Sequence, residues 1–285
     1  MSAILWLLDA DPAIRWQAMR DLTDATPPVI GAERARVARE GLGAEILECQ
    51  GADGAWHRDD CPDWLPTLFT MQLLRATGVN PADPRVVSAA SRLEEGFRWP
   101  GEHGAKPFFG GEVEPCINGG TLALGAYFGH ASESLMHRLL SEQLADGGWN
   151  CDAPPSTRSS YHSTICVLEG LIEYERVAGS SPELAAARAR GDERLLARGL
   201  FRRLSSGEVA HPSFLMFGFP PRYEYDVLRA LDYFRSAEPL EHTQGPARPQ
   251  MARRRFSESL TATMPIVRTT ADRTWVDARC GWSRD

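Results

Sequence analysis

Residues that could bind a metal ion gather between positions 114 and 162. Glu114 and Cys116 precede one apolar, small-residue segment, His162 begins a second, and Cys151 and Asp152 lie in the connection between them. Thiolate, imidazole and carboxylate ligands together suit Zn²⁺, with an open position where the site is catalytic. The sequence therefore predicts one zinc ion held by Cys116, Cys151 and His162. Glu114 or Asp152 would be the fourth ligand.

Two of these residues are expected at helix N-termini. The backbone N–H groups there would favour a thiolate at Cys116 and a neutral imidazole at His162. Neighbouring helices pack with their axes about 8–10 Å apart, so side chains from their first turns can meet at one ion. The alternative interpretation is that Cys116 and Cys151 are packed thiols and that His162 is a capping polar group.

The elements that would position these residues form a repeated pattern of helix pairs. In each pair a charged outer helix precedes an apolar inner helix, and a separate helix is expected at 12–22. Repeats of two helices stack either as an open solenoid or as a closed ring. The predicted outer helices are 33–50, 84–97, 134–144 and 182–202, and the predicted inner helices are 65–76, 116–128, 162–174 and 223–234.

A turn signature of the form Gln-x3-Gly-x-Trp occurs twice, after two of the outer helices. Glycine allows a tight turn, glutamine can cap a helix end, and tryptophan can pack against the neighbouring hairpin. The signature is therefore expected to be structural rather than catalytic. Its residues are Gln50, Gly54 and Trp56, and then Gln143, Gly147 and Trp149.

This signature, after a Leu-rich helix, resembles the repeat of squalene–hopene cyclases and of the β subunits of protein prenyltransferases. The resemblance covers roughly residues 33–235. It implies an α/α toroid, a ring of inner helices inside a ring of outer helices. The stretches GGWNCD, HSTICVLEGLIEYE and FGFPPRYEYDVLRALDYF look closest to short bacterial squalene-cyclase-like proteins.

The domain prediction follows from this resemblance. Residues 1–237 are expected to form the toroid with an N-terminal accessory helix. Residues 238–285 lack a fifth Gln-x3-Gly-x-Trp turn and an apolar helical stripe, which leaves closure of the ring open. They are predicted to be an irregular or mobile tail, because too little apolar surface offsets their ordering entropy.

The resemblance also bears on the metal site. Prenyltransferase β subunits hold zinc with an Asp-x-Cys at the start of one inner helix and a His at the start of a later one. Glu114-Pro115-Cys116 falls at the place of the Asp-x-Cys, with Glu as a departure, and His162 falls at the place of the His. The Asp-x-Asp-Asp of the cyclases is missing. In the nearest carboxylate cluster, at 58–64, one of the crowded carboxylates could be held protonated and act as an acid. The favoured interpretation is a solvated loop that caps a helix.

Candidate substrate-binding residues lie in the later loops. Arg158, Arg222 and Tyr223 could bind a diphosphate at the pocket mouth. His211 begins an aromatic run, 211–225, that includes Phe217 and could line an apolar cavity. Alternatively, the arginines are surface residues and the aromatic run packs the ring. The resulting hypothesis is a cyclase- or prenyltransferase-like enzyme acting on an isoprenoid or other hydrophobic substrate. The alternative is a non-catalytic ligand-binding or scaffold protein with the same fold.

Composition limits the remaining classes. The chain has 285 residues and a formal net charge of -7, which argues against nucleic acid as a main partner. The apolar run at the N-terminus ends at Asp9, too early for a membrane span, and no signal peptide is expected. A cytoplasmic location follows as the expectation, with the six cysteines as reduced thiols.

Overall fold

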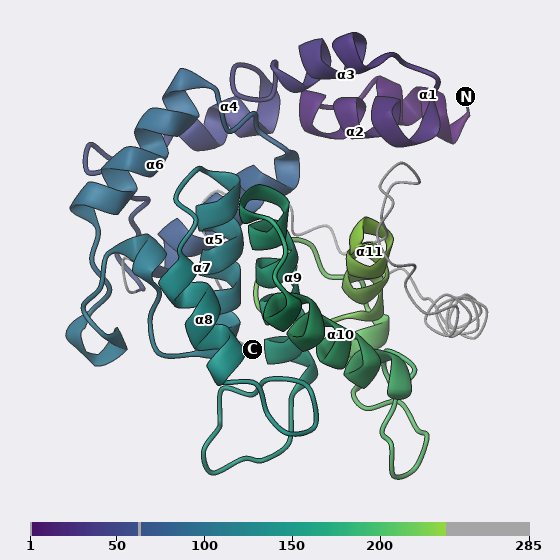
Figure 1. Cartoon of the computed structure of the whole chain (residues 1–285). Coiled ribbons are helices and arrows are strands. Elements are labelled where there is room, and N and C mark those ends of the chain that lie inside the picture. Colours follow the sequence, from purple (N-terminus) through teal and green to yellow (C-terminus); the bar gives the residue numbers. More distant parts are fainter. Residues whose placement is uncertain (1, 62–63, 238–285) are drawn as a thin grey trace. The chain divides into compact units, whose positions relative to one another are not determined.

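The structure is a computed structural model that describes residues 2–61 and 64–237 (Figure 1). Over these residues the chain is all-α, as the sequence predicts. It forms eleven α-helices and three short 3₁₀ helices, with isolated β-bridges but no strand. The described chain divides into two compact units. Unit 1 comprises the residues up to 113 together with 121–135, and unit 2 comprises 114–120 together with those from 136 onward.

Unit 1 contains six complete helices and the second half of a seventh. In it α1 packs on α2, and α2 packs on α3 and α4, while α4 packs on α5. The elements are α1 (Ala3–Leu8), α2 (Pro12–Leu22), α3 (Pro27–Arg34), α4 (Gly41–Glu48), α5 (Trp64–Thr77), α6 (Pro84–Gly96), the 3₁₀ helices η1 (Gly101–His103) and η2 (Phe108–Gly110), and the later part of α7 (Pro115–Tyr127).

Unit 2 begins with the first turns of α7 and is centred on α9, on which both α10 and α11 pack. Most of α9 is buried, so this helix is the core of the unit. The other elements are most of α8 (Glu133–Ser141), then α9 (Tyr161–Ala178), α10 (Pro182–Ala197), η3 (Pro212–Leu215) and α11 (Val227–Ala237).

Side-chain caps explain where several helices begin. Asp11 Oδ1 accepts the Ala13 N–H at 2.8 Å at the start of α2, and Pro12 follows the cap. Ser160 Oγ likewise accepts the Ser163 N–H at 3.0 Å at the start of α9. Such caps satisfy N–H groups that have no partner within the helix, and each is worth about 1 kcal/mol.

The single helix predicted over 33–50 is wrong, because α3 and α4 are separated by a turn. Gly41 begins α4 with φ +64°, a conformation that glycine adopts at little cost. Val37 is fully buried inside the turn, so its apolar side chain belongs to the core without belonging to a helix. Asp11 Oδ2 accepts the Leu42 N–H at 2.9 Å and ties the start of α4 to α2.

The other predicted helices are present with shifted ends. The helix predicted at 134–144 ends earlier, because the Leu144 N–H donates to the Gly148 carbonyl and so belongs to the turn. The helix predicted at 182–202 ends at Ala197, before two residues of positive φ. The helix predicted at 223–234 begins four residues later. The sequence analysis did not anticipate α1, or α3 as a separate helix.

The Gln-x3-Gly-x-Trp turn of unit 1 is closed by three hydrogen bonds. Gln50 Nε2 donates to the Gly54 carbonyl at 2.7 Å. Trp56 Nε1 donates to the Ile46 carbonyl on α4 at 2.9 Å. The Trp56 backbone N–H donates to Thr67 Oγ1 on α5 at 3.0 Å. The turn therefore joins the helix before it to the helix after it.

The turn of unit 2 repeats this set bond for bond. Gln143 Nε2 donates to the Gly147 carbonyl at 2.7 Å, and Trp149 Nε1 donates to the Leu139 carbonyl on α8 at 2.7 Å. The Trp149 backbone N–H donates to Thr164 Oγ1 on α9 at 3.1 Å. These bonds are those expected of a structural turn, the role that the sequence predicts for both signatures.

Both turn glycines have positive φ and lie against a later helix of their own unit, α6 or α10. Their φ values are +86° at Gly54 and +94° at Gly147. A Cβ at Gly54 would lie 2.6 Å from Arg92 of α6, and one at Gly147 would lie 2.7 Å from the Arg190 carbonyl of α10. Each of these arginines donates to the glutamine of its own turn. Each position therefore requires glycine, because its φ is positive and because a Cβ would collide with the neighbouring helix.

Glycine also permits a close crossing of two helices in unit 2. A Cβ on Gly119 of α7 would collide with the backbone carbonyl of Cys166 on α9. A Cβ on Gly170 would collide with the carbonyl of Gly119 in turn. The part of α7 around Gly119 is therefore in direct backbone contact with the part of α9 between Cys166 and Gly170.

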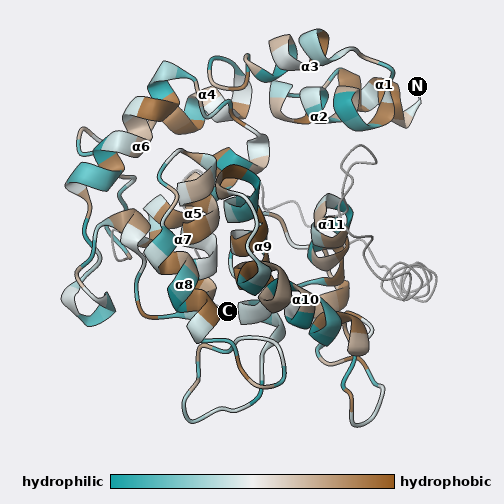
Figure 2. Ribbon diagram, in the orientation of Figure 1, coloured by the Kyte–Doolittle hydropathy of each residue, from teal (hydrophilic) through white to brown (hydrophobic). Residues whose placement is uncertain are grey.

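The helices α6 and α9 differ in how much of their surface is buried. Figure 2 shows hydrophilic and hydrophobic residues mixed along α6 and α10. On α6 the buried residues are confined to one stripe, whereas α9 is buried on nearly all sides. None of the described helices is long and apolar enough to cross a membrane. The predicted tail, 238–285, and Cys280 within it lie outside the described residues.

Candidate metal centre

Three of the predicted ligands meet in unit 2. One ligand atom each from Glu114, Cys116 and Cys151 lies within 4.8 Å of the others. The two sulfur atoms are 2.9 Å apart, and Cys116 Sγ lies 3.6 Å from Glu114 Oε2. Glu114 is exposed and both cysteines are partly buried, so the group lies at the surface of the unit.

The crossing of α7 and α9 places Cys116. Cys116 lies on the first turn of α7, directly after Pro115, one turn before the glycine that contacts α9. Because that contact is between backbones, the start of α7 has little freedom to move relative to α9.

The Gln-x3-Gly-x-Trp turn places Cys151. It follows Trp149 by two residues, after the turn has closed. The Cys151 N–H donates to Ser163 Oγ at 3.2 Å, and Cys151 Sγ lies 3.2 Å from the same oxygen. Ser163 is on the first turn of α9 and also accepts a hydrogen bond from Ser160 Oγ at 2.9 Å. A serine thus orients the sulfur of the loop cysteine.

Hydrogen bonding shifts the pKa values of the two thiols in opposite directions. Cys116 Sγ and Cys151 Sγ are hydrogen-bonded at 2.9 Å, and this bond, together with burial, raises the pKa of Cys116. The same bond lowers the pKa of Cys151, and the hydrogen bond with Ser163 contributes in the same direction. Cys151 is therefore the sulfur that carries negative charge more readily.

The donor set fits zinc. Two thiolates and one carboxylate are ligand types that Zn²⁺ uses, and three protein ligands leave a fourth position for water or substrate. Thiolates on a tetrahedral zinc with bonds of about 2.3 Å lie about 3.8 Å apart. The observed 2.9 Å separation would have to open by about 1 Å, a movement that side-chain rotation in the Cys151 loop can supply.

His162 is held away from this group. Its Nδ1 accepts the Tyr225 backbone N–H at 2.9 Å, so a neutral ring carries its proton on Nε2. A metal-bound histidine instead donates its second N–H to a partner. Burial lowers the pKa of His162, which keeps the ring neutral. Asp152 is exposed, and neither residue belongs to the cluster that the described residues form.

The carboxylate cluster before α5 does not resemble a general acid. Arg58 and Asp60 are ion-paired, and the bond from Arg58 lowers the pKa of the exposed Asp60 carboxyl. A proton donor to an alkene would need the opposite shift. The pair therefore supports the interpretation of this segment as a solvated loop. Its positions 62–63 lie outside the described residues.

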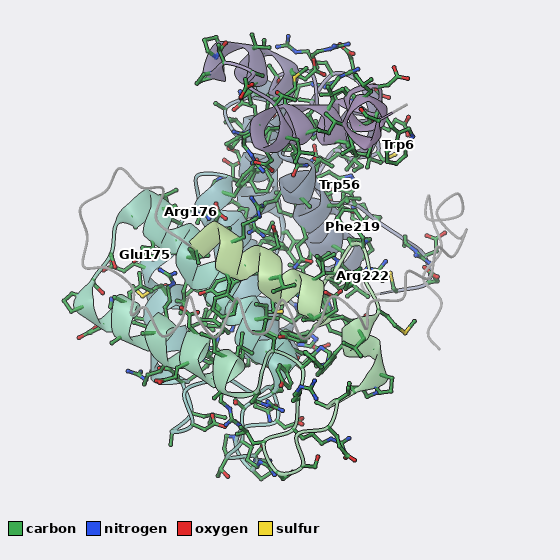
Figure 3. All side chains as sticks on the ribbon, turned by 90° about the vertical axis from the view of Figure 1, so that its right-hand side faces the viewer. Trp6, Trp56, Glu175, Arg176, Phe219 and Arg222 are labelled. Carbon is green, nitrogen blue, oxygen red and sulfur yellow. The ribbon has the colours of Figure 1, made fainter. Side chains whose placement is uncertain are left out.

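The predicted substrate-binding residues lie mainly at the surface. Arg158, His211 and Tyr223 are exposed, and His211 Nδ1 is bonded to Ser213 Oγ at 2.7 Å. Phe217 and Arg222 are partly buried. Figure 3 labels Arg222, together with Phe219, in the loop before α11.

Other aromatic residues of the same run form a buried cluster. The ring of Phe214 lies 5.0 Å from Tyr161 and 5.0 Å from Tyr225, and those two rings are 4.7 Å apart. Tyr225 Oη donates to the Leu200 carbonyl at 2.5 Å. These contacts fit the packing interpretation for Phe214 and Tyr225.

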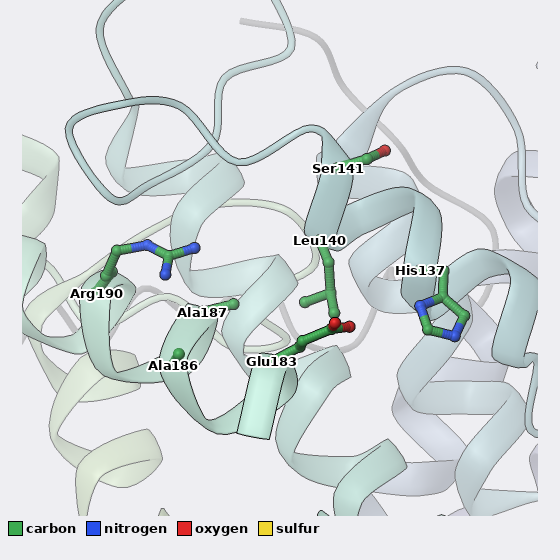
Figure 4. Close-up of a pocket in the computed structure, with 7 residues that line it drawn as sticks. All are labelled: His137, Leu140, Ser141, Glu183, Ala186, Ala187 and Arg190. Atoms are coloured by element: carbon green, nitrogen blue, oxygen red, sulfur yellow. The ribbon is translucent and has the colours of Figure 1, made fainter. Parts of the chain in front are cut away.

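A pocket of unit 2 lies between α8 and α10 (Figure 4). Its cavity volume is about 450 Å³, and α8 and α10 supply its walls. None of the predicted ligands or substrate-binding residues lines it. The lining residues are His137, Leu140, Ser141, Glu183, Ala186, Ala187 and Arg190.

Comparisons with known proteins do not assign the chain to a family. No protein-family model, curated protein or solved structure matches it. The site is therefore interpreted from its own residues.

The sequence analysis missed three kinds of residue near the site. Ser163 holds Cys151, and a serine two residues into an inner helix gives no metal signal in the sequence. Thr164 accepts from the turn tryptophan, a role visible only through its counterpart in the first repeat. Arg229 of α11 pairs with Glu169 at 2.8 Å and donates to Cys166 Sγ at 3.4 Å, where burial raises the pKa of that thiol to about 11.

Proposed function

We propose that this protein is a zinc-dependent enzyme of the α/α-toroid type that acts on an isoprenoid or other hydrophobic substrate. The observation that carries the proposal is the convergence of Glu114, Cys116 and Cys151 within 4.8 Å. The duplicated turn, which resembles that of cyclases and prenyltransferases, supports the toroid arrangement. Zinc held by three protein ligands keeps the open position that catalytic zinc sites have.

The chain's own residues would prepare this site. A bound zinc would act as a Lewis acid and would lower the pKa of a thiol or water at its fourth position. Cys116 is fixed by the α7–α9 crossing, and Cys151 is oriented by Ser163. Glu114 supplies an oxygen ligand and a negative charge at the exposed edge. We assign His162 a packing role, because its Nδ1 accepts a hydrogen bond from the backbone N–H of Tyr225.

A second candidate function is that of a non-catalytic ligand-binding or scaffold protein with the same fold. It is favoured by the exposure of Arg158, His211 and Tyr223, which do not line the pocket between α8 and α10. Native mass spectrometry of the purified protein separates the two proposals. A hydrophobic molecule retained by the chain, together with turnover of an isoprenoid diphosphate probe, supports the enzyme. Retention without turnover supports the binding protein.

The zinc proposal is tested by metal analysis after expression in zinc-supplemented medium. The wild type should contain about one zinc per chain, and Cys116→Ser and Cys151→Ser should each lose it. Cys49→Ser is the matched control, because Cys49 is an exposed thiol at the end of α4 and should leave the zinc content unchanged.

A fourth variant distinguishes the ligand set expected from the sequence from the set that converges in the structure. His162→Ala should keep its zinc if the three converging residues are the ligands, and should lose it if the imidazole is one of them. A wild type without zinc would overturn the proposal.

A further inference from the structure

We propose that Cys116 and Cys151 are a modification site at which a peroxide closes the two thiols into a reversible disulfide. The carrying observation is the separation of 2.9 Å between the two sulfur atoms. The two sulfur atoms are already in direct contact, since even non-bonded carbon atoms settle at about 3.5–4.0 Å. The inference about the disulfide stands on this geometry and does not require zinc.

The separation lies midway between two bonded arrangements. A disulfide has sulfur atoms about 2.05 Å apart, and two thiolates on one zinc have sulfur atoms about 3.8 Å apart. From 2.9 Å, either arrangement requires a change of about 1 Å. Cys151 lies in the loop between the turn and α9, whereas Cys116 lies on a helix, so the loop side can supply the movement.

Access and surroundings favour this pair over the other thiol of the same region. Both cysteines are partly exposed, so a small oxidant can reach them. Cys166 is buried at 2% exposure and accepts a hydrogen bond from Arg229. Cys49 is exposed, but it lies on α4 of the other unit.

The chemistry balances with hydrogen peroxide as the oxidant. One thiol takes an oxygen atom from the peroxide, giving a sulfenic acid and one water. The sulfur of the second thiol then attacks the sulfenic sulfur, the S–S bond forms, and the oxygen leaves as a second water. Two thiols lose two electrons and two protons in all, and the peroxide is reduced to two waters. A dithiol or phosphine reductant reverses the change.

One consequence rests on the proposed function. A disulfide sulfur is a poor metal ligand, since zinc is bound by thiolates. Oxidation of the pair would therefore expel zinc, and bound zinc would protect the pair. If the site binds no zinc, the dithiol still closes, and only this coupling is lost.

The experiment uses the full-length chain, prepared without metal and treated with hydrogen peroxide. The intact mass should fall by about 2 Da, and peptide mapping without reduction should link Cys116 to Cys151. Treatment with a reductant should restore the mass. Cys49→Ser should behave as the wild type. Cys116→Ser should form no such link, and its Cys151 should be trapped as a sulfenic acid by a dimedone probe.

The outcomes separate the two proposals. A Cys116–Cys151 link in a protein that binds no zinc supports the dithiol site and overturns the zinc proposal. Zinc binding without a link, even after metal removal and peroxide treatment, overturns the dithiol site and leaves the zinc proposal standing. Links formed mainly by other cysteine pairs also overturn the dithiol site. If both proposals hold, added zinc should slow formation of the link by at least about tenfold, since thiolates bound to zinc are not free to react.

Discussion

At the scale of single residues, Asp146 shows how one carboxylate ties a turn to the loop that follows it. Its oxygens accept the Gly148 N–H at 3.3 Å and both the N–H and the hydroxyl of Ser159 at 3.0 Å. Arg194 of α10 lies 2.9 Å away as an ion-pair partner. The loop that carries Cys151 is thus closed by a residue outside the candidate ligand set.

This carboxylate should make stability depend on pH. Partial burial would raise the pKa of Asp146, but the bonds from Ser159 and Gly148 and the charge of Arg194 outweigh it and lower the pKa below the usual 3.8. A lowered folded-state pKa contributes stability above pH 3.8, and the contribution is lost as pH falls through the folded value. Asp146→Asn should therefore be less stable than the wild type at pH 7, and the difference should shrink towards pH 3.

Urea unfolding followed by circular dichroism at pH 7, 5 and 3 measures this difference. Asp152→Asn is the control, because it removes the same charge from an exposed position of the same loop. A difference that stays constant or grows on acidification would contradict the assignment.

The residues of the turn could be predicted because their contacts are local. Gln143 and Gly147 bond within five positions, so the spacing in the sequence carries the information. His162 could not be placed in this way. Whether its ring faces a metal depends on Tyr225, which lies 63 residues later.

At the scale of elements, the crossing of α7 and α9 decides where the first candidate ligand lies. Gly119 and Gly170 contact each other's helices through backbone atoms alone. Added side chains would have no space to enter, and overpacking of this kind costs about 1–3 kcal/mol. The small-residue character of these segments is thus a requirement of packing.

Gly119→Ala should destabilise the protein by about 1–3 kcal/mol, because its Cβ would meet the Cys166 carbonyl. Gly31→Ala is the matched control on α3, where no atom lies within 4 Å of the added Cβ. That change should stabilise by up to about 1 kcal/mol, since alanine is the better helix former. Chemical denaturation of both variants measures the contrast, and equal effects would refute the close crossing.

Helix starts were more predictable than helix interiors. Asp11 followed by proline indicated the start of α2 correctly, because the cap chemistry lies within three residues. The apolar spacing over 33–50 indicated one helix instead of two. Val37 fits a helical stripe in the sequence but is buried in a turn, and the periodicity cannot distinguish these cases.

At the scale of the whole molecule, the all-α class could be predicted because nearly every apolar segment has helical spacing. The helical spacing could not predict contacts in loops between residues that are distant in the sequence. Cys116 and Cys151 were predicted to bind one ion together with His162, but the structure brings Glu114 to the two cysteines and not His162. The loop between the turn and α9, held by Ser163, is what brings the second sulfur to the first.

Zinc should stabilise the whole chain if the proposed site is correct. A ligand at about 100 times its dissociation constant contributes about 2.7 kcal/mol, which corresponds to a rise in Tm of roughly 5–10 °C. Thermal melts with zinc and with a chelator measure the shift, and Cys116→Ser should show none. The shift should decrease as pH is lowered from 7.5 to 5.5, because protons compete with the metal for the ligands. An equal shift in the Cys116 variant would assign it to binding elsewhere.

The duplicated turn also provides a search pattern for distantly related chains. Its bonds define a composite motif, in which a threonine follows the tryptophan and an arginine follows the glutamine. The interval from the tryptophan to the threonine is 11 residues in unit 1 and 15 in unit 2. The interval from the glutamine to the arginine is 42 residues in unit 1 and 47 in unit 2. A sequence search that fixes the bonded residues and allows the two intervals to vary would find chains with this turn that a contiguous signature misses. Variation in the Trp-to-Thr gap would point directly to the loops in which new ligands can be introduced.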